Sequence, residues 1–182
     1  MDIRIYVAGR LGLEVGGELV IGDRQFRGRQ GRLVFAYLVC ERTRPVRREE
    51  LAEVLWPGET PPAWEADLSA LVSRLRGLLA PTAPKPKELF ISGSSGNYQL
   101  HLPADTWVDL EAAAFAIDQA EGALRAGDRQ RAWGPANVAV TIARRPFLSG
   151  EQGEWVESQR REARAAAAAL PGMPGRDLAV HK

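Results

Sequence analysis

The segment between Asp67 and Leu79 limits the choice of folds more than any other part of this 182-residue chain. Its apolar residues recur at positions i, i+3, i+4 and i+7, which is the spacing of an amphipathic helix with one face in a core. These residues are Leu68, Leu71, Val72, Leu75, Leu78 and Leu79. Arg74 and Arg76 fall off this stripe, so the pattern predicts a helix over residues 64–79 that holds two guanidinium groups in solvent.

A β-hairpin is predicted after this helix, over residues 89–102, with Gly93, Gly96 and Asn97 at its tip. A proline-rich connection, residues 80–87, is expected to be extended and to join the two. An amphipathic helix with outward arginines, followed by a hairpin, is the layout of a winged-helix recognition helix and its wing. That layout places arginines against the phosphates and base edges of a major groove.

The residues before this helix complete the same fold in outline. Short strands are predicted at residues 2–7, 13–15 and 19–21, with Gly16 and Gly17 as a tight turn. Helices are predicted at residues 29–42, ended by Pro45, and at residues 48–56. The fold class is therefore α+β: a winged helix-turn-helix with an N-terminal antiparallel sheet and a C-terminal wing hairpin.

The second half of the chain is alanine-rich and helix-periodic, which predicts a small all-α unit after the wing. Its three helices are expected at residues 107–124, 129–143 and 154–170. The arrangement is typical of a helical-hairpin (TPR-like) repeat, and Trp107, Trp133 and Trp155 are expected to form its core. The domains are therefore predicted at residues 1–103 and 104–170, with a disordered tail at residues 171–182.

The net charge is only +1, but the positive charge is unevenly placed. Between Arg24 and Arg48 the chain carries eight arginines and one acid, Glu41. A local basic patch binds polyanions even when the total charge is near zero. Such runs also occur as plain solvated surface, so the charge alone leaves both interpretations open.

Few groups in the chain suggest catalysis or metal binding. Cys40 is the only cysteine, which excludes an internal disulfide and a cysteine metal site, and we expect it to be buried as a small hydrophobe. His101 and His181 are isolated, and no nucleophile–base pair or phosphate-binding loop is recognisable. No apolar run has the length of a membrane span, and the N-terminus resembles a strand and not a signal peptide. We therefore expect a cytoplasmic protein that is not an enzyme, with no cofactor, no metal and no membrane partner.

Several short motifs together resemble the actinobacterial antibiotic-regulatory-protein (SARP) family. In the first half they are Arg29-Gln-Gly-Arg-Leu, Val46-Arg-Arg-Glu-Glu-Leu-Ala-Glu-Val-Leu-Trp-Pro, Leu71-Val-Ser-Arg-Leu-Arg and Gly96-Asn-Tyr-Gln-Leu. In the second half they are Val108-Asp-Leu-Glu-Ala, Ala123-Leu-Arg-Ala-Gly-Asp and Pro146-Phe-Leu-Ser-Gly-Glu-Gln-Gly-Glu-Trp-Val-Glu-Ser-Gln-Arg. The resemblance covers residues 1–165 and implies a response-regulator type of winged helix, followed by the opening of a bacterial transcriptional activator domain.

The resemblance implies sequence-specific binding of double-stranded DNA at direct repeats near a promoter, with recruitment of RNA polymerase. The DNA-binding residues that it implies are Arg29, Arg47, Arg48, Ser69, Ala70, Ser73, Arg74 and Arg76. Arg74 would read base edges, with the three small residues of the same helix beside it, and the other arginines would contact phosphates. The loop Pro57–Ala63 would face the polymerase.

Two features favour a second hypothesis from a different class. Glu65 and Asp67 open the recognition helix, where a carboxylate repels phosphate, and the wing tip at residues 92–97 carries no arginine or lysine. A degenerate winged helix that serves as a protein-interaction or ligand-sensing module, without DNA binding, accounts for both. The sequence leaves open whether the chain activates or represses transcription, and whether it forms a homodimer.

Overall fold

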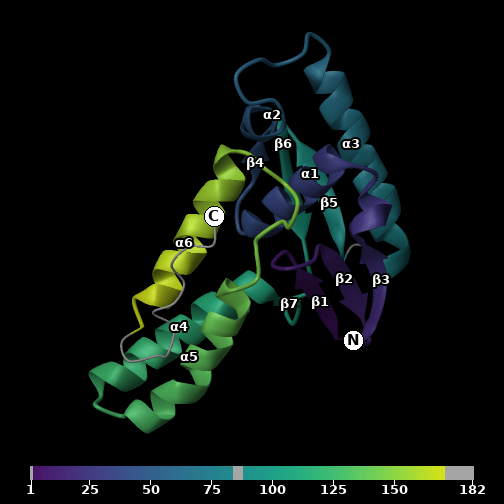
Figure 1. Cartoon of the computed structure of the whole chain (residues 1–182). Coiled ribbons are helices and arrows are strands. Elements are labelled where there is room, and N and C mark those ends of the chain that lie inside the picture. Colours follow the sequence, from purple (N-terminus) through teal and green to yellow (C-terminus); the bar gives the residue numbers. More distant parts are fainter. Residues whose placement is uncertain (1, 84–87, 171–182) are drawn as a thin grey trace.

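The computed structural model of the chain describes residues 2–83 and 88–170, which form two small sheets and six α-helices (Figure 1). The first sheet has the order β3-β2-β1-β7, from β1 (Ile3–Tyr6), β2 (Gly12–Val15), β3 (Glu18–Gly22) and β7 (Trp107–Val108). The second has the order β4-β6-β5, from β4 (Val46–Arg47), β5 (Phe90–Ser94) and β6 (Asn97–His101). The helices are α1 (Arg29–Cys40), α2 (Arg48–Leu55), α3 (Trp64–Leu79), α4 (Asp109–Arg125), α5 (Arg129–Ala143) and α6 (Glu154–Ala168), with short 3-10 helices η1 (Asp23–Phe26) and η2 (Ala80–Thr82). The predicted fold class, an α+β winged helix followed by a helical unit, is confirmed.

The N-terminal sheet forms the first layer of the core. β1 pairs with β2 in antiparallel register, with Ile5 opposite Leu13, and both side chains are buried. The turn between β2 and β3 has φ values of 62° at Gly16 and 87° at Gly17. Glycine adopts this left-handed backbone without steric cost, so the predicted tight turn is confirmed.

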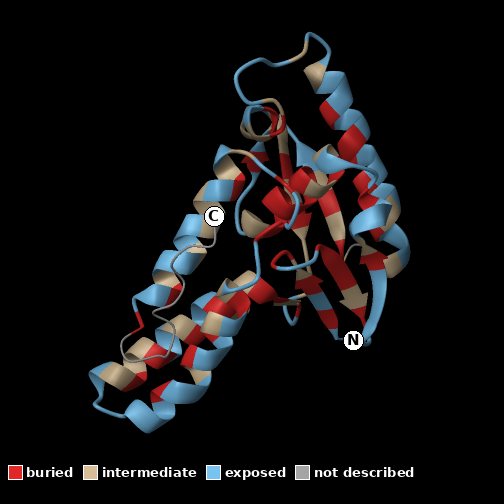
Figure 2. Ribbon diagram, viewed as in Figure 1, coloured by how far each residue is buried: buried red, intermediate tan, exposed pale blue. Residues whose placement is uncertain are grey.

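The winged-helix core lies between α1, α2, α3 and the hairpin of β5 and β6. α3 has the predicted bounds, with its apolar stripe turned inward and its polar side exposed (Figure 2). Leu68 and Val72 of this stripe are fully buried, as is Phe35 of α1. The stripe on α3 therefore does what its spacing predicts, which leaves Arg74 and Arg76 on the outside.

The sequence pattern does not predict the two short strands β4 and β7. β4 adds Val46 opposite Tyr98 and so completes the sheet of the hairpin. β7 replaces the first turn of a predicted helix, because Trp107 and Val108 pair in parallel with β1. A strand of two residues has no alternation to recognise, and the partner of β7 lies far away in the sequence.

Two further elements differ from their predicted form. α1 ends at Cys40, before the predicted end at Arg42, because the chain turns over residues 41–44 and brings β4 beside β6. η2 is a 3-10 turn where an extended connection is predicted. The rest of that connection, residues 84–87, and the predicted disordered tail, residues 171–182, lie outside the described residues.

α4 and α5 form the predicted helical hairpin, packed through alanines (Figure 1). The buried alanines between them include Ala116, Ala120, Ala136 and Ala139. This interface is too narrow for an indole, and Trp133 lies outside it with 53% of its surface exposed. The prediction that Trp133 is a core residue is therefore wrong.

Trp107 and Trp155, the other two tryptophans of the predicted helical core, pack where the helical unit meets the winged helix. The ring of Trp107 is 5.4 Å from that of Tyr6 on β1. The ring of Trp155 is 4.9 Å from that of Tyr37 on α1 and 5.3 Å from that of Phe147. They therefore join the two parts of the chain instead of filling a separate helical core.

Backbone hydrogen bonds fasten the helical unit to the end of β1. The buried carboxylate of Asp109, at the start of α4, accepts hydrogen bonds from the N–H groups of Val7 (3.0 Å) and Ala8 (2.8 Å). Burial raises the pKa of Asp109, while these backbone hydrogen bonds lower it. The N–H of Leu148 donates to the carbonyl of Val7 (2.9 Å). The parts on either side of the predicted boundary at residues 103–104 thus share one core.

Candidate nucleic-acid interface

The outer face of α3 carries five of the residues to which the sequence assigns DNA contacts. They are Ser69, Ala70, Ser73, Arg74 and Arg76, all exposed. The two arginines leave this face on opposite sides. Nε of Arg76 donates to the carbonyl of Ile91 on β5 (2.9 Å), whereas Arg74 lines a surface pocket with Phe26 and Arg27 near η1. α3 therefore presents small side chains between two guanidinium groups.

The wing holds two arginines against one aromatic ring. Cζ of Arg76 and Cζ of Arg48 lie 5.9 and 5.5 Å from the ring centroid of Tyr98, within the range of cation–π attraction. Gly93 leaves the space for this, because a Cβ there would lie 2.7 Å from Nη2 of Arg76. The N–H of Arg48 donates to the carbonyl of Gly96 (3.1 Å). The sequence analysis missed these roles of Tyr98 and Gly93, since no local pattern signals them.

Arg47 lies at the N-terminus of α2 beside a cluster of charges. Its N–H and its Nε donate to the carboxylate of Glu50, at 3.2 and 3.1 Å. Nη2 of Arg44 donates to the same carboxylate (2.8 Å). The hydrogen bond from Arg44 is the main reason why the pKa of Glu50 falls to about 2, and the bonds from Arg47 add to it.

We expect Glu50→Gln to lower the free energy of unfolding at neutral pH by up to about 1 kcal/mol and to flatten its dependence on acid. Folding lowers the pKa of this carboxyl from 4.5 to about 2. The ionised group therefore contributes stability above pH 4.5, and the contribution disappears as the pH falls towards 2. Urea unfolding of both proteins over this pH range measures the effect, and parallel stability curves would contradict it.

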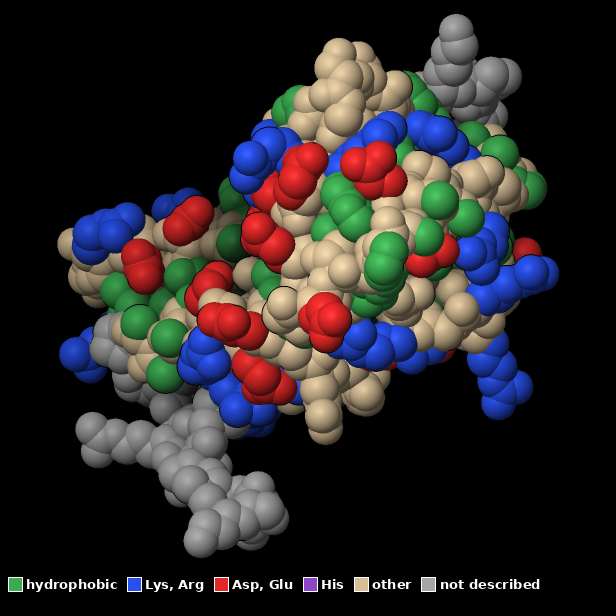
Figure 3. Space-filling view, turned by 90° about the horizontal axis from the view of Figure 1, so that it is seen from above, with side chains coloured by type: hydrophobic (Ala, Val, Ile, Leu, Met, Phe, Trp, Pro, Cys, Tyr) green, Lys and Arg blue, Asp and Glu red, His purple; other side chains and the backbone are tan. Residues whose placement is uncertain are grey.

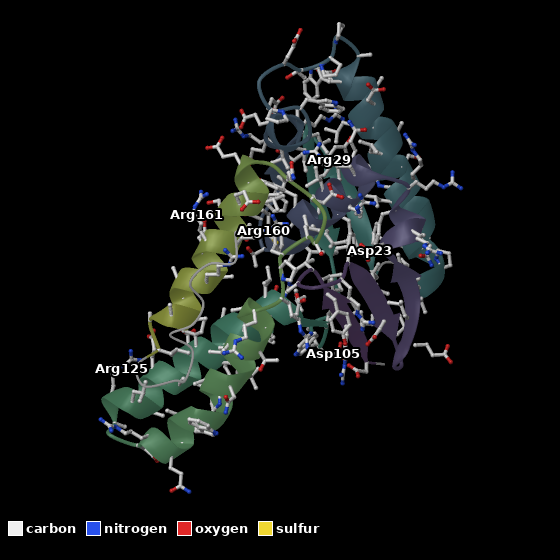
Figure 4. The ribbon with its side chains drawn as sticks, viewed as in Figure 1. Asp23, Arg29, Asp105, Arg125, Arg160 and Arg161 are labelled. Carbon is white, nitrogen blue, oxygen red and sulfur yellow. The ribbon has the colours of Figure 1, made fainter. Side chains whose placement is uncertain are left out.

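Arg29 lies apart from the other predicted phosphate contacts, at the junction with α6 (Figure 4). Its Nε is 3.5 Å from Oε2 of Glu151, and its Nη2 donates to the carbonyl of Gln152 (3.0 Å). Arg32 pairs with the same Glu151, whose side chain is only 3% exposed. Arg29 is thus placed to hold the α5–α6 connection against α1, and its contact with a phosphate stays a prediction.

The basic run between Arg24 and Arg48 is largely neutralised by carboxylates. The paired arginines are Arg29, Arg32, Arg42, Arg44 and Arg47. Two of their partners, Glu111 and Glu151, come from the helical unit. Within the described residues, Arg24 and Arg27 form no ion pair and no side-chain hydrogen bond. Accordingly, Figure 3 shows acidic and basic side chains interspersed on the face seen from above.

The acidic start of α3 has a structural cause. Glu65 and Asp67 lie exposed in its first turn, and neither forms an ion pair within residues 2–83 and 88–170. Negative side chains at a helix N-terminus interact favourably with the helix dipole. The wing tip turns through Ser95 and Gly96, with φ values of 49° and 79°. It bears no charged side chain there, in keeping with the sequence.

Other reactive groups in the described part of the chain are few. Cys40 packs at the edge of the core, and burial is the main cause that raises the pKa of its thiol to about 12. His101 stacks on Phe90 and lies 2.9 Å from the hydroxyl of Ser92. Among the described residues, no cluster of His, Cys, Asp or Glu is arranged to hold a metal, and no helix has the length and hydropathy to cross a bilayer.

Comparison with known proteins finds a likeness in fold. No known protein family and no curated protein matches this sequence. The structure is similar to that of Mycobacterium tuberculosis EmbR in complex with a low-affinity phosphopeptide, with a TM-score of 0.66 and 25% sequence identity. The similarity covers 93% of this chain and 41% of EmbR, so the chain spans about two fifths of that protein. The winged helix and the helical unit together are thus similar in fold to part of EmbR.

Proposed function

We propose that the chain is a sequence-specific DNA-binding regulator of transcription that acts in the cytoplasm and is not an enzyme. The observation that carries this proposal is the outer face of α3, where small side chains lie between Arg74 and Arg76 and the wing packs alongside. The similarity in fold to part of EmbR supports the arrangement of a winged helix and a helical unit on which this proposal depends. The fold alone carries no specificity, so the proposal depends on these side chains.

In this proposal α3 lies in the major groove, as the recognition helix of a winged helix does. Arg74 forms two hydrogen bonds to the edge of a guanine, which is worth about 1–3 kcal/mol of discrimination against other bases. Ser69, Ala70 and Ser73 lie beside it, and their small size lets the helix approach the base edges.

The remaining residues contact the backbone and the transcription machinery. Arg47, Arg48 and Arg76 contact phosphates on the wing side, so binding weakens steeply with salt as counterions are released. The exposed loop between α2 and α3, Pro57–Ala63, faces RNA polymerase. The chain then acts as an activator at direct repeats near promoters, as a monomer or as a homodimer formed on DNA.

Arg74→Ala is expected to abolish the preference for a duplex selected from random-sequence DNA over an unselected one. Arg76→Ala and Arg48→Ala are expected to weaken both duplexes alike and to reduce the salt slope by about one each, because each loses a phosphate contact. Fluorescence anisotropy titrations at several salt concentrations measure both quantities. A preference that survives Arg74→Ala would remove Arg74 from base recognition.

The second candidate function is a protein-interaction or ligand-sensing module on a degenerate winged helix. The acidic first turn of α3, with Glu65 and Asp67, and the uncharged wing tip favour it. A gel-shift titration at low salt with random and genomic duplexes separates the two candidates. If the folded protein retards no duplex at micromolar concentration, the regulator proposal fails and the second candidate takes its place.

A further inference from the structure

We propose that the surface pocket between η1 and α3 seats a phosphate of the DNA strand opposite the wing, with Arg27 as its cationic ligand. This inference rests on the proposed DNA-binding function and extends it to a part of the surface that the sequence motifs do not assign. The DNA interface then has two sides. Arg48 and Arg76, on the ring of Tyr98, lie on one flank of α3, and Arg27 lies on the other.

The pocket combines two arginines with apolar side chains in its lining. Its volume is about 320 Å³, and Phe26, Leu75 and Leu78 are among its apolar lining residues. Arg27 and Arg74 both contribute to the lining, together with Gln25. A phosphate with its attached sugar has an anionic and an apolar part, and this lining offers a contact for each.

The charge on Arg27 is uncommitted, in contrast to most of the basic run. Five of the eight arginines between Arg24 and Arg48 are paired with carboxylates, as described above. Within the described residues, Arg27 has no side-chain partner, and its neighbour Arg24 does not line the pocket. Among the same described residues, Arg48 also has no carboxylate partner, but it lies on the ring of Tyr98 on the wing side, so Arg27 is the unpaired arginine of this run that lines the pocket.

The backbone at Arg27, where η1 ends, has an unusual conformation. Its φ is 50°, in the left-handed region that residues other than glycine and asparagine rarely adopt. The N–H of Arg27 faces the carbonyl of Arg24 (3.5 Å), and Gly28 follows with φ of 101°. Residues in this left-handed region occur often at ligand sites.

Arginines without a carboxylate partner in the described part of the chain lie on both sides of α3, as the two phosphate backbones lie on both sides of a major groove. Arg76 lies on the hairpin side of α3 and stacks with Arg48 on the ring of Tyr98. Arg27 lies on the other side, next to Arg74. A helix that enters a major groove has a phosphate backbone along each flank. Arg27 is thus placed to contact the strand that the wing does not reach.

The test measures salt-dependent DNA binding of Arg27→Gln, Arg27→Lys and a control. Because Gln and Lys meet the same backbone strain as Arg, neither substitution changes the local cost of the left-handed conformation. We expect Arg27→Gln to weaken binding to selected and unselected duplexes alike, by roughly three- to tenfold at low salt, and to reduce the salt slope by about one. Arg27→Lys should keep the slope, which a purely structural role would not predict. Arg131→Gln removes an exposed charge on α5 and should change neither quantity.

The outcomes distinguish this inference from the proposed function. If Arg76→Ala weakens binding while Arg27→Gln leaves affinity and slope unchanged, the Arg27 site is wrong and the regulator proposal stands. If Arg27→Gln weakens only the selected duplex, Arg27 contacts a base and the phosphate assignment is wrong. If the wild-type protein binds no duplex, the proposed function and this inference both fail.

Discussion

Replacing Asp109 with alanine is expected to lower the free energy of unfolding by about 2–4 kcal/mol. The substitution leaves the buried N–H groups of Val7 and Ala8 without an acceptor, and each such group costs about 1–3 kcal/mol. Burial raises the pKa of Asp109, so the native state also bears a cost for burying the ionised carboxylate. The alanine variant avoids this cost, and the net loss of stability is therefore smaller than the combined cost of the two unpaired N–H groups. Urea unfolding, followed by circular dichroism, measures the change.

Two variants control this experiment. Asp109→Asn keeps one carbonyl oxygen as an acceptor and should lose less stability than Asp109→Ala. Asp105→Ala removes an exposed carboxylate four residues earlier and should stay within about 0.5 kcal/mol of wild type (Figure 4). An Asp109→Ala protein as stable as Asp105→Ala would show that Asp109 does not fasten α4 to β1.

The elements that the sequence predicts well are those whose signal is local. The bounds of α3 follow from the spacing of its leucines, and the turn at Gly16 and Gly17 follows from two residues that tolerate left-handed backbone. β7 could not be predicted in this way, because its two residues gain their conformation from β1, about a hundred positions earlier. Trp133 was misplaced because the alanine interface of α4 and α5, and not the size of the side chain, decides which residues are buried.

In the candidate interface, too, the sequence predicts the features with a local signal and misses those that depend on distant residues. Helical spacing is sufficient to place Arg74 and Arg76 on the outside of α3. The run of arginines before it is misleading when charges are counted without partners. Glu111 and Glu151, which neutralise Arg42 and Arg32, are distant in sequence and reach them only through the packing of the helical unit. The sequence therefore gives no signal of the partners of Arg29, and none that separates Arg27 from the neighbouring arginines.

Gly31→Ala is expected to destabilise the protein by about 1–2 kcal/mol, although alanine is the better helix former. In a helix without neighbours the substitution would gain about 1 kcal/mol. At position 31 of α1, however, a Cβ would overlap the backbone carbonyl of Phe26, which cannot rotate away as a flexible side chain can. Overpacking against a fixed group costs about 1–3 kcal/mol or more, so the contact outweighs the propensity.

Gly122→Ala provides the matched control, because this glycine also lies within a helix, α4, and a Cβ there meets nothing within 4 Å. It should raise the free energy of unfolding by about 0.5–1 kcal/mol, measured by the same urea titrations. We expect the free energy of unfolding to fall in Gly31→Ala and to rise in Gly122→Ala. A stabilised Gly31→Ala protein would contradict the close packing of η1 on α1. That packing also shapes the pocket beside α3, since Gly31 and Phe26 both line it. A Gly31→Ala protein that stays folded should therefore weaken DNA binding through displacement of Arg27, while contacts on the wing side of α3 persist.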